Sequence, residues 1–185
     1  MSKQPTVLVF AASNSTTSIN KSLALHAAQV LQGELAVTIE TLDLNDFEMP
    51  IYSPEREQAG GIPQLAQDFY ARIGSADALI ISYAEYNGLY TAAFKNIFDW
   101  CSRIDMKLYQ NKPQIALSTS PGSRGGENVL KVVVDSAQFF GGNLKGSLAV
   151  GSFYENFDLE KGQLTDAKLA DSLREAVLAL KATLE

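Results

Sequence analysis

Cysteine and histidine are almost missing from this sequence, which holds one of each, Cys101 and His26. A lone cysteine forms no disulfide within the chain, and the two residues offer too few soft ligands for a structural zinc site. We therefore expect a cytoplasmic protein without a metal of its own. Because no cysteine–histidine pattern accompanies Cys101, we expect it to pack in the core rather than act as a nucleophile, and we expect His26 to be structural or at the surface.

Long apolar runs and clusters of basic residues are absent as well. The longest apolar run, Val7 to Ala12, is far shorter than the ~20 residues of a membrane span, and Lys3 alone makes a weak start for a signal peptide. The 15 basic and 21 acidic residues give a net charge of -6, which offers a nucleic acid backbone little attraction. We therefore expect that the protein binds neither a membrane nor a nucleic acid.

The residues that are present predict a globular α/β protein. Of 185 residues, 46% are hydrophobic and 19% are charged, which favours a single domain over residues 1–185. Short apolar runs predict five strands: Thr6–Ala12, Leu35–Leu42, Ala78–Ala84, Pro113–Thr119 and Gly146–Phe153. Longer segments predict helices: Ser18–Gln32, Ile62–Ser75, Ala92–Ile104, Glu127–Phe140, and Asp166 to the end. Their strict alternation predicts a five-stranded parallel sheet with helices on both faces.

Two of the segments between the predicted strands allow more than one interpretation. The valines 132–134 favour a strand, but the length and place of Glu127–Phe140 favour a helix. Its apolar residues fall on nearly every face, so we expect this helix to contact another subunit in a homodimer or homotetramer. The polar segment Ser53–Ile62 is predicted to be a loop. Met49–Tyr52 is either a plain apolar loop after the second strand, which we favour, or the side of the cleft near a bound ring.

In a doubly wound sheet, ligands bind beyond the carboxyl ends of the strands, so the loops after the first, third and fourth strands are the candidates. The first, Ala12–Asn20, is a run of hydroxyl and amide side chains before a helix. Free N–H groups and the helix dipole make such a place suitable for a terminal phosphate. The alternative is that Ser18 or Thr17 only caps the helix. The glycines of a dinucleotide fingerprint are absent.

The other two loops are ambiguous by themselves. Ala84–Tyr90 is either a surface for a planar heterocycle, with an aromatic ring, an amide and accessible backbone, or an ordinary turn. Ser118–Gly126 holds three closely spaced glycines, which either let the backbone approach a ligand or make a flexible connection. Within it, Arg124 either binds a nucleotide phosphate or faces water.

Glu85-Tyr86-Asn87-Gly88 is followed by Phe94-Lys95-Asn96-Ile97-Phe98-Asp99-Trp100. This arrangement resembles the signature of the NADPH-dependent FMN reductase family, Pro-Glu-Tyr-Asn and then Leu-Lys-Asn-x-x-Asp-Trp. The first loop is similar to the family's through Ser13, Ser18 and Asn20, and the third through the pair Gly125-Gly126, so the resemblance runs along the whole chain.

Three departures from the family pattern matter: Ala12 and Ala84 replace a glycine and a proline, and Ser15 replaces an arginine. The missing arginine removes a charged partner for a phosphate, so hydroxyls, amides and the helix dipole must neutralise it.

The resemblance implies a flavodoxin-like three-layer sandwich with strand order 2-1-3-4-5 that holds FMN noncovalently. It implies that the phosphate end is held by Ser13, Ser15, Ser18, Ile19 and Asn20. It also implies that the isoalloxazine ring is lined by Glu85, Tyr86, Asn87 and Gly88, and that its other edge is closed by Ser120, Gly122 and Gly125.

The function that the resemblance implies is an NAD(P)H oxidoreductase with ping-pong hydride transfer. NADPH or NADH gives a hydride to the flavin and leaves, and a small acceptor then takes its place: a free flavin, a quinone, an azo compound or chromate. Because the flavin carries the chemistry, no catalytic side chain is predicted. Two alternatives stay open, a flavodoxin-type electron carrier and, because the arginine is missing, a flavin-free regulatory protein.

Overall fold

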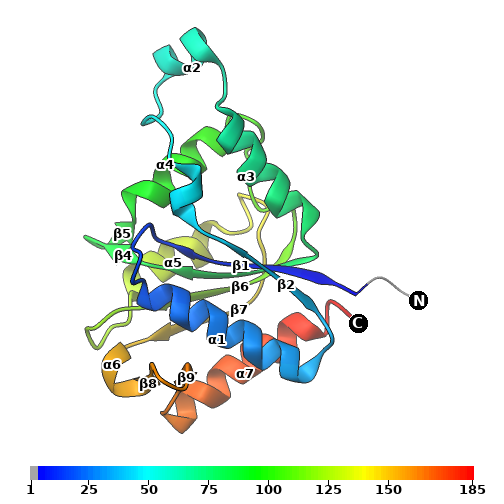
Figure 1. The fold of residues 1–185 in the computed structure, drawn as a ribbon, viewed down its shortest axis with the longest axis vertical. Coiled ribbons are helices and arrows are strands. Elements are labelled where there is room, and N and C mark those ends of the chain that lie inside the picture. The colour runs from blue at the N-terminus through cyan, green and yellow to red at the C-terminus, as the bar shows by residue number, and fades with distance from the viewer. Residues whose placement is uncertain (1–3) are drawn as a thin grey trace.

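The computed structural model describes residues 4–185. Its centre is a parallel sheet of five strands in the order β2-β1-β3-β6-β7 (Figure 1). The strands are β1 (Thr6–Ala12), β2 (Thr38–Leu42), β3 (Ala78–Tyr83), β6 (Pro113–Thr119) and β7 (Asn143–Val150). Counted along the main sheet, this is the predicted order 2-1-3-4-5, so the fold class predicted from the sequence is confirmed.

Helices cover both faces of the sheet and complete a three-layer sandwich (Figure 1). They are α1 (Ile19–Glu34), α3 (Gln64–Ser75), α4 (Ala92–Cys101), α5 (Glu127–Ser136) and α7 (Ala167–Lys181). Side chains alternate along a strand, so Val7 and Val9 pack under α1 and α7, whereas Leu8 and Phe10 pack under α3, α4 and α5. Within the described residues, no helix is long and apolar enough to cross a membrane.

Shorter elements lie in the segments that connect the main strands and helices. They are η1 (Leu44–Phe47), α2 (Pro54–Gly60), α6 (Phe153–Asn156), and two hairpins, β4 (Glu85–Tyr86) with β5 (Leu89–Tyr90) and β8 (Phe157–Asp158) with β9 (Gln163–Leu164). Helix α2 buries none of its residues and projects from the body of the molecule (Figure 1).

The prediction of a loop over Ser53–Ile62 is wrong, because α2 forms there. Pro54 occupies its first turn, where a missing N–H costs nothing, and the Ser53 hydroxyl accepts from the Arg56 N–H. Gly61, with a φ of 74°, ends the helix. Local capping chemistry outweighed the polar composition of the segment.

The remaining differences concern element ends. The helix predicted over Glu127–Phe140 is confirmed across the three valines but ends at Ser136. The last strand runs over Asn143–Val150 rather than Gly146–Phe153, because its pairing with β6 begins at Pro113 and Asn143, and Phe153 already starts α6. The second strand begins at Thr38 rather than Leu35.

Candidate functional site

The loops after β1, β3 and β6 meet in one cavity of about 270 Å³ at the carboxyl edge of the sheet. We call it the three-loop pocket. The predicted site residues that line it are Ser13, Ser15, Ser18, Ile19, Asn20, Glu85, Tyr86 and Ser120. The structure therefore brings together side chains that lie more than one hundred residues apart in the sequence.

The first loop leaves hydrogen-bonding groups free at the start of α1. The Ser18 hydroxyl caps the helix by accepting from the Lys21 N–H at 3.3 Å, and the Ser13 hydroxyl accepts from the Ser15 N–H at 3.2 Å. Within residues 4–185, the side chains of Ser15 and Thr17 make no hydrogen bond, although both line the pocket. Free hydroxyls next to the N-terminus of a helix suit an anion such as a phosphate.

Asn20 differs from the rest of the first loop because its side chain is buried and bound to the protein. Its Oδ1 accepts from the Ser82 hydroxyl at 2.7 Å and from the Thr119 N–H at 3.0 Å, and its Nδ2 donates to the Thr119 carbonyl at 3.1 Å. These bonds join the first turn of α1 to the ends of β3 and β6. Asn20 thus positions the helix start beside the pocket.

The second loop is a tight hairpin whose tip lies outside the pocket lining. Asn87 and Gly88 have φ values of 54° and 83°, the conformation of a two-residue turn between β4 and β5. The structure does not bring these two residues into the three-loop pocket, whereas Glu85 and the half-exposed Tyr86 do line it. The turn interpretation of Asn87-Gly88 therefore accounts for their local geometry.

The Glu85 carboxylate joins this hairpin to α5. It accepts from the Val129 N–H at 3.0 Å and from the Asn128 Nδ2 at 3.2 Å. The residue at the N-cap of α5 is Gly126, which has no side chain to cap the helix. Glu85 supplies that cap from another loop, and so ties the second loop to the start of α5, which directly follows the third loop.

The third loop is fixed by protein contacts rather than flexible. The Gly125 carbonyl accepts from the Ser118 hydroxyl at 2.8 Å, and the Gly122 carbonyl accepts from the Ser152 N–H at 2.9 Å. A Cβ on Gly125 would lie 2.5 Å from the carbonyl carbon of Val150, so β7 occupies the space that the glycine leaves. Gly122 and Gly125 do not line the pocket, and Ser120 does.

The lining also includes residues that were not predicted as site residues. Thr17, Ala84, Thr119 and Pro121 lie within the three candidate loops, whereas Tyr154 lies outside them. Tyr154 is the largest, with 63% of its surface exposed, and it comes from α6, which follows β7. A signal for it was present, because the carboxyl end of the last strand lies at the same edge of the sheet as the other three loops.

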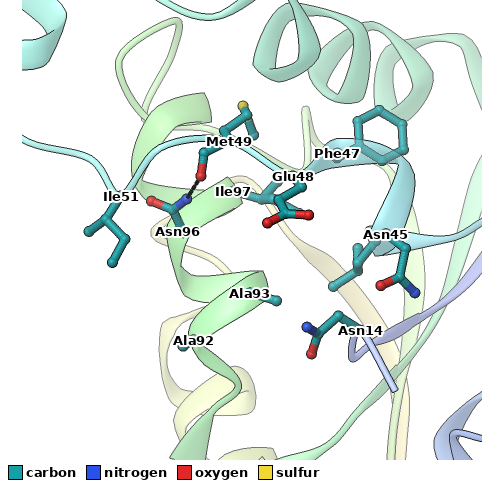
Figure 2. A pocket seen from close by; sticks show the side chains of 11 residues that line it. Asn14, Asn45, Phe47, Glu48, Met49, Ile51, Ala92, Ala93, Asn96 and Ile97 are labelled. Atoms are coloured by element: carbon teal, nitrogen blue, oxygen red, sulfur yellow. Dashed lines mark hydrogen bonds between the residues drawn. The ribbon is translucent and has the colours of Figure 1, made fainter. Parts of the chain in front are cut away.

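A second cavity of about 250 Å³ lies between the first loop, α4 and the segment after β2 (Figure 2). Its lining includes Asn14, Glu48, Met49, Ile51 and Ala93. We call it the clamped pocket. Met49 and Ile51 thus line a cavity, but not the three-loop pocket, so the alternative that Met49–Tyr52 lies near a bound ring stays a prediction.

The clamp is made by two signature residues of α4. Asn96 Nδ2 donates to the Met49 and Pro50 carbonyls at 3.1 and 3.2 Å, and its Oδ1 accepts from the Tyr52 N–H at 2.9 Å. Trp100 Nε1 donates to the Pro50 carbonyl at 2.7 Å. The other two signature side chains, of Lys95 and Asp99, pair with each other at 2.7 Å on the surface. The α4 part of the signature therefore shapes the wall of a pocket.

The lone cysteine and histidine serve the fold. Cys101 is buried, its Sγ donates to the Ala66 carbonyl at 3.4 Å, and burial raises the pKa of its thiol to about 12. His26 Nε2 accepts from the Leu164 N–H at 3.4 Å, and partial burial lowers the pKa of the imidazole. Among the described residues, no cluster of three His, Cys, Asp or Glu side chains could hold a metal ion.

Known proteins resemble this chain over most of its length. An NAD(P)H-dependent FMN reductase of Pseudomonas aeruginosa is 28% identical over 147 residues, which cover 78% of this chain and 77% of that protein. An NADPH:quinone oxidoreductase of Arabidopsis thaliana is 28% identical over 150 residues, which cover 78% and 73%. The structure of FerB, a flavoenzyme NAD(P)H:(acceptor) oxidoreductase from Paracoccus denitrificans, superposes with a TM-score of 0.74 at 23% identity over 97% of each chain.

Residues 5–154 match the family described as NADPH-dependent FMN reductase. The match covers all three loops of the pocket and the α4 signature. It confirms the predicted enzyme class, an oxidoreductase that uses FMN and NAD(P)H. On this evidence, together with the fold, the chain belongs to the NADPH-dependent FMN reductase family.

Proposed function

We propose that the three-loop pocket is the FMN site, where electrons pass from NAD(P)H to a small acceptor in two successive half-reactions. The observation that carries this proposal is the convergence of the three loops on one cavity at the switch point of the sheet. When bound there, FMN supplies the chemistry by taking a hydride from NAD(P)H and passing two electrons on. The residues of the chain bind it, orient it and leave one side open.

The phosphate end is proposed to lie against the first loop, where Ser13, Ser15, Ser18, Ile19 and Asn20 surround the start of α1. Of the described residues that line the pocket, none is Lys or Arg. Lys21, in the first turn of α1, pairs with Asp43 at 2.9 Å. Hydroxyls, backbone N–H groups and the helix dipole must therefore stabilise the phosphate charge.

The ring end is proposed to lie between the second and third loops, against Glu85 and Tyr86 on one side and Ser120 on the other. Asn87, Gly88, Gly122 and Gly125 do not line the pocket, and their proposed part is to set the backbone course of these two loops. Support comes from the half-exposed Tyr86 and from the Glu85 contacts that tie the second loop to the start of α5, directly after the third loop. A rigid pocket of this kind orients a planar ring without a chemical role for any side chain.

The visible spectrum of the purified protein tests this assignment first, and stopped-flow mixing with NADPH tests it second. We expect a yellow protein that prefers FMN to FAD and riboflavin, and whose flavin bleaches directly on mixing. Equal affinity for riboflavin would contradict the phosphate assignment. A flavin that NADPH fails to bleach would favour an electron carrier, and a colourless protein that takes up no FMN would favour a regulatory role.

We also propose that the protein is a cytoplasmic homodimer or homotetramer in which α5 forms a contact. The structure leaves Val134 and Phe139 exposed, by 40% and 68%, on and just after α5. Exposed apolar side chains of this kind favour self-association. Light scattering at several concentrations tests the proposal, and a mass that stays at the monomer value would overturn it.

A further inference from the structure

We propose that Asn87, at the tip of the β4–β5 hairpin, is a site of spontaneous deamidation, and that its products disturb the second loop of the three-loop pocket. The reagents are the backbone nitrogen of Gly88 and water, so no enzyme is needed. The modification itself rests only on the geometry of the hairpin. Its effect on FMN binding rests on the proposed function, because Glu85 and Tyr86 of the same hairpin are assigned to the ring end.

Gly88 leaves the attacking nitrogen unhindered. Among the asparagines of the chain, Asn87 alone is followed by glycine. The residue after Asn87 therefore has no side chain to shield its backbone nitrogen, and even a Cβ built on Gly88 would meet no atom within 4 Å. Within the described residues, the Gly88 N–H donates no hydrogen bond. The nitrogen can therefore react without first breaking one.

The side-chain amide of Asn87 is free as well. Asn87 is exposed, and in the part of the chain that the structure describes its amide makes no hydrogen bond, whereas Glu85 of the same hairpin makes two. Asn20 and Asn96 differ, because each is held by three hydrogen bonds to other parts of the protein. Asn87 thus combines a free amide with a free neighbouring nitrogen.

The hairpin is short enough to open locally. Its strands pair through two residues each, and Tyr86 and Leu89, which face each other beside the turn, are 50% and 57% exposed. Little buried apolar surface therefore opposes opening. Asn87 has a φ of 54°, in the left-handed region that strains any residue with a side chain. Opening releases this strain and lets the Asn87 side chain rotate toward the Gly88 nitrogen.

The reaction needs neither an oxidant nor a reductant. Solvent hydroxide removes the proton of the Gly88 N–H, and the nitrogen forms a bond to Cγ of Asn87. The bond from Cγ to Nδ2 breaks, ammonia leaves with a proton from water, and a cyclic succinimide remains. Water then opens one of the two ring carbonyls. The products are aspartate and isoaspartate, in which the main chain runs through the side-chain carboxyl carbon.

Either product changes the loop beside the proposed ring end. Aspartate adds a negative charge near Glu85, in a protein whose net charge is already -6. Isoaspartate lengthens the backbone, so the two-residue turn no longer fits the pairing of Tyr86 with Leu89. Glu85 stays bonded to α5, at the base of the hairpin. Tyr86 is therefore the pocket residue that we expect to move.

Isotope uptake tests the modification. The protein as purified is aged in mildly alkaline, heavy-oxygen water and then digested in ordinary water, so that the label marks only what happened before digestion. Trypsin releases a peptide of residues 73–95, in which Asn87 is the only side-chain amide. We expect Asn87 to take up the label about tenfold faster than Asn14, because no side chain shields the glycine nitrogen.

Asn14 is the internal control for this comparison. It is exposed too, and its side chain makes no hydrogen bond within residues 4–185, but the Ser15 N–H that follows it donates to the Ser13 hydroxyl at 3.2 Å. A sample unfolded in urea shows how fast Asn87 reacts without the fold, and Asn87→Gln should leave the peptide of residues 73–95 unlabelled. The proposal is overturned if Asn87 takes up label in urea but, in the folded protein, no faster than Asn14.

Flavin titration before and after ageing tests the effect on the pocket. The FMN affinity of the wild type should fall about threefold or more, a size that an exposed charge interaction alone can reach. Aged Asn87→Gln should keep the affinity with which it started. Unchanged affinity in wild-type protein whose Asn87 is fully converted would overturn the effect on the second loop. Failure of the fresh wild type to bind FMN would instead overturn the proposed function, while the isotope label would still decide the modification.

Discussion

The two pockets at the carboxyl edge of the sheet differ in where their polar side chains find partners. In the three-loop pocket, the Ser15 and Thr17 hydroxyls have no hydrogen-bond partner among residues 4–185. In the clamped pocket, Asn96 and Trp100 direct their polar atoms to the backbone of the protein. The hydroxyls of the three-loop pocket are therefore free to bind a ligand, whereas the polar atoms of Asn96 and Trp100 hold residues 49–52 in place.

This difference separates binding residues from positioning residues within one family signature. The residues Lys95–Trp100 belong to the signature, yet none of them lines the three-loop pocket. Asn20 shows that the distinction also holds within a single loop, because it lines the three-loop pocket but is bonded like a residue of the clamp. Substitutions of binding residues should therefore change the affinity for FMN, and substitutions of positioning residues should change the free energy of unfolding.

The largest effect is expected for Asn20→Ala. It leaves the Ser82 hydroxyl and the Thr119 N–H buried without their acceptor, so the free energy of unfolding should fall by about 3 kcal/mol. FMN binding should weaken by about 1–3 kcal/mol, because the helix start is no longer held. Urea denaturation and flavin titration measure the two changes. A loss of FMN affinity at unchanged stability would show that Asn20 acts on the ligand directly.

Asn96→Ala should lower the free energy of unfolding by about 2 kcal/mol, because three hydrogen bonds to residues 49–52 are lost in a partly exposed place. FMN affinity should stay close to the wild-type value. The control is the neighbouring Lys95→Ala, which removes only a surface ion pair and should cost less than about 1 kcal/mol. A strong loss of FMN affinity in Asn96→Ala would contradict the separation of the two pockets.

Ser15→Arg adds a charged group to the three-loop pocket, whereas the preceding substitutions remove hydrogen-bonding groups. If the loop has the family geometry, the new guanidinium should tighten FMN binding by up to about 1.5–3 kcal/mol, and by less where solvent screens it. Ser15→Gln controls for size without charge. Flavin titration at low and high salt measures the change, and weaker binding in Ser15→Arg would show that the loop differs from the family's in shape.

The smallest effect concerns His26, which lies in neither pocket. Partial burial lowers its pKa from 6.5, so the unfolded chain binds a proton at a higher pH than the folded protein does. The resulting stability is complete above the ordinary pKa and is lost as the pH falls toward the lowered one. Urea midpoints between about pH 7.5 and pH 5.5 should fall less in His26→Gln than in the wild type. If the urea midpoints of both proteins fall equally with pH, His26 makes no such contribution to stability.

The sequence determined the layered fold, because strand and helix patterns are local. Apolar runs such as Thr6–Ala12 and Pro113–Thr119 coincide with β1 and β6 to the residue. The polar run before α1 likewise predicted a helix start that leaves free donors, since capping and dipole effects act over a few neighbouring residues. The candidate loops followed from the topology, which places the carboxyl ends of the parallel strands at one edge.

The partners of individual polar side chains were decided only by the tertiary structure. Asn20 bonds to Thr119 across 99 residues, Asn96 to Met49 across 47, and Glu85 to Val129 across 44. An amide or a carboxylate has the same donors and acceptors whether it faces a ligand or a distant carbonyl. The role of such a side chain therefore depends on which backbone groups the folded sheet and helices bring within hydrogen-bonding distance. Because those groups are far away in the sequence, the neighbouring residues do not identify them.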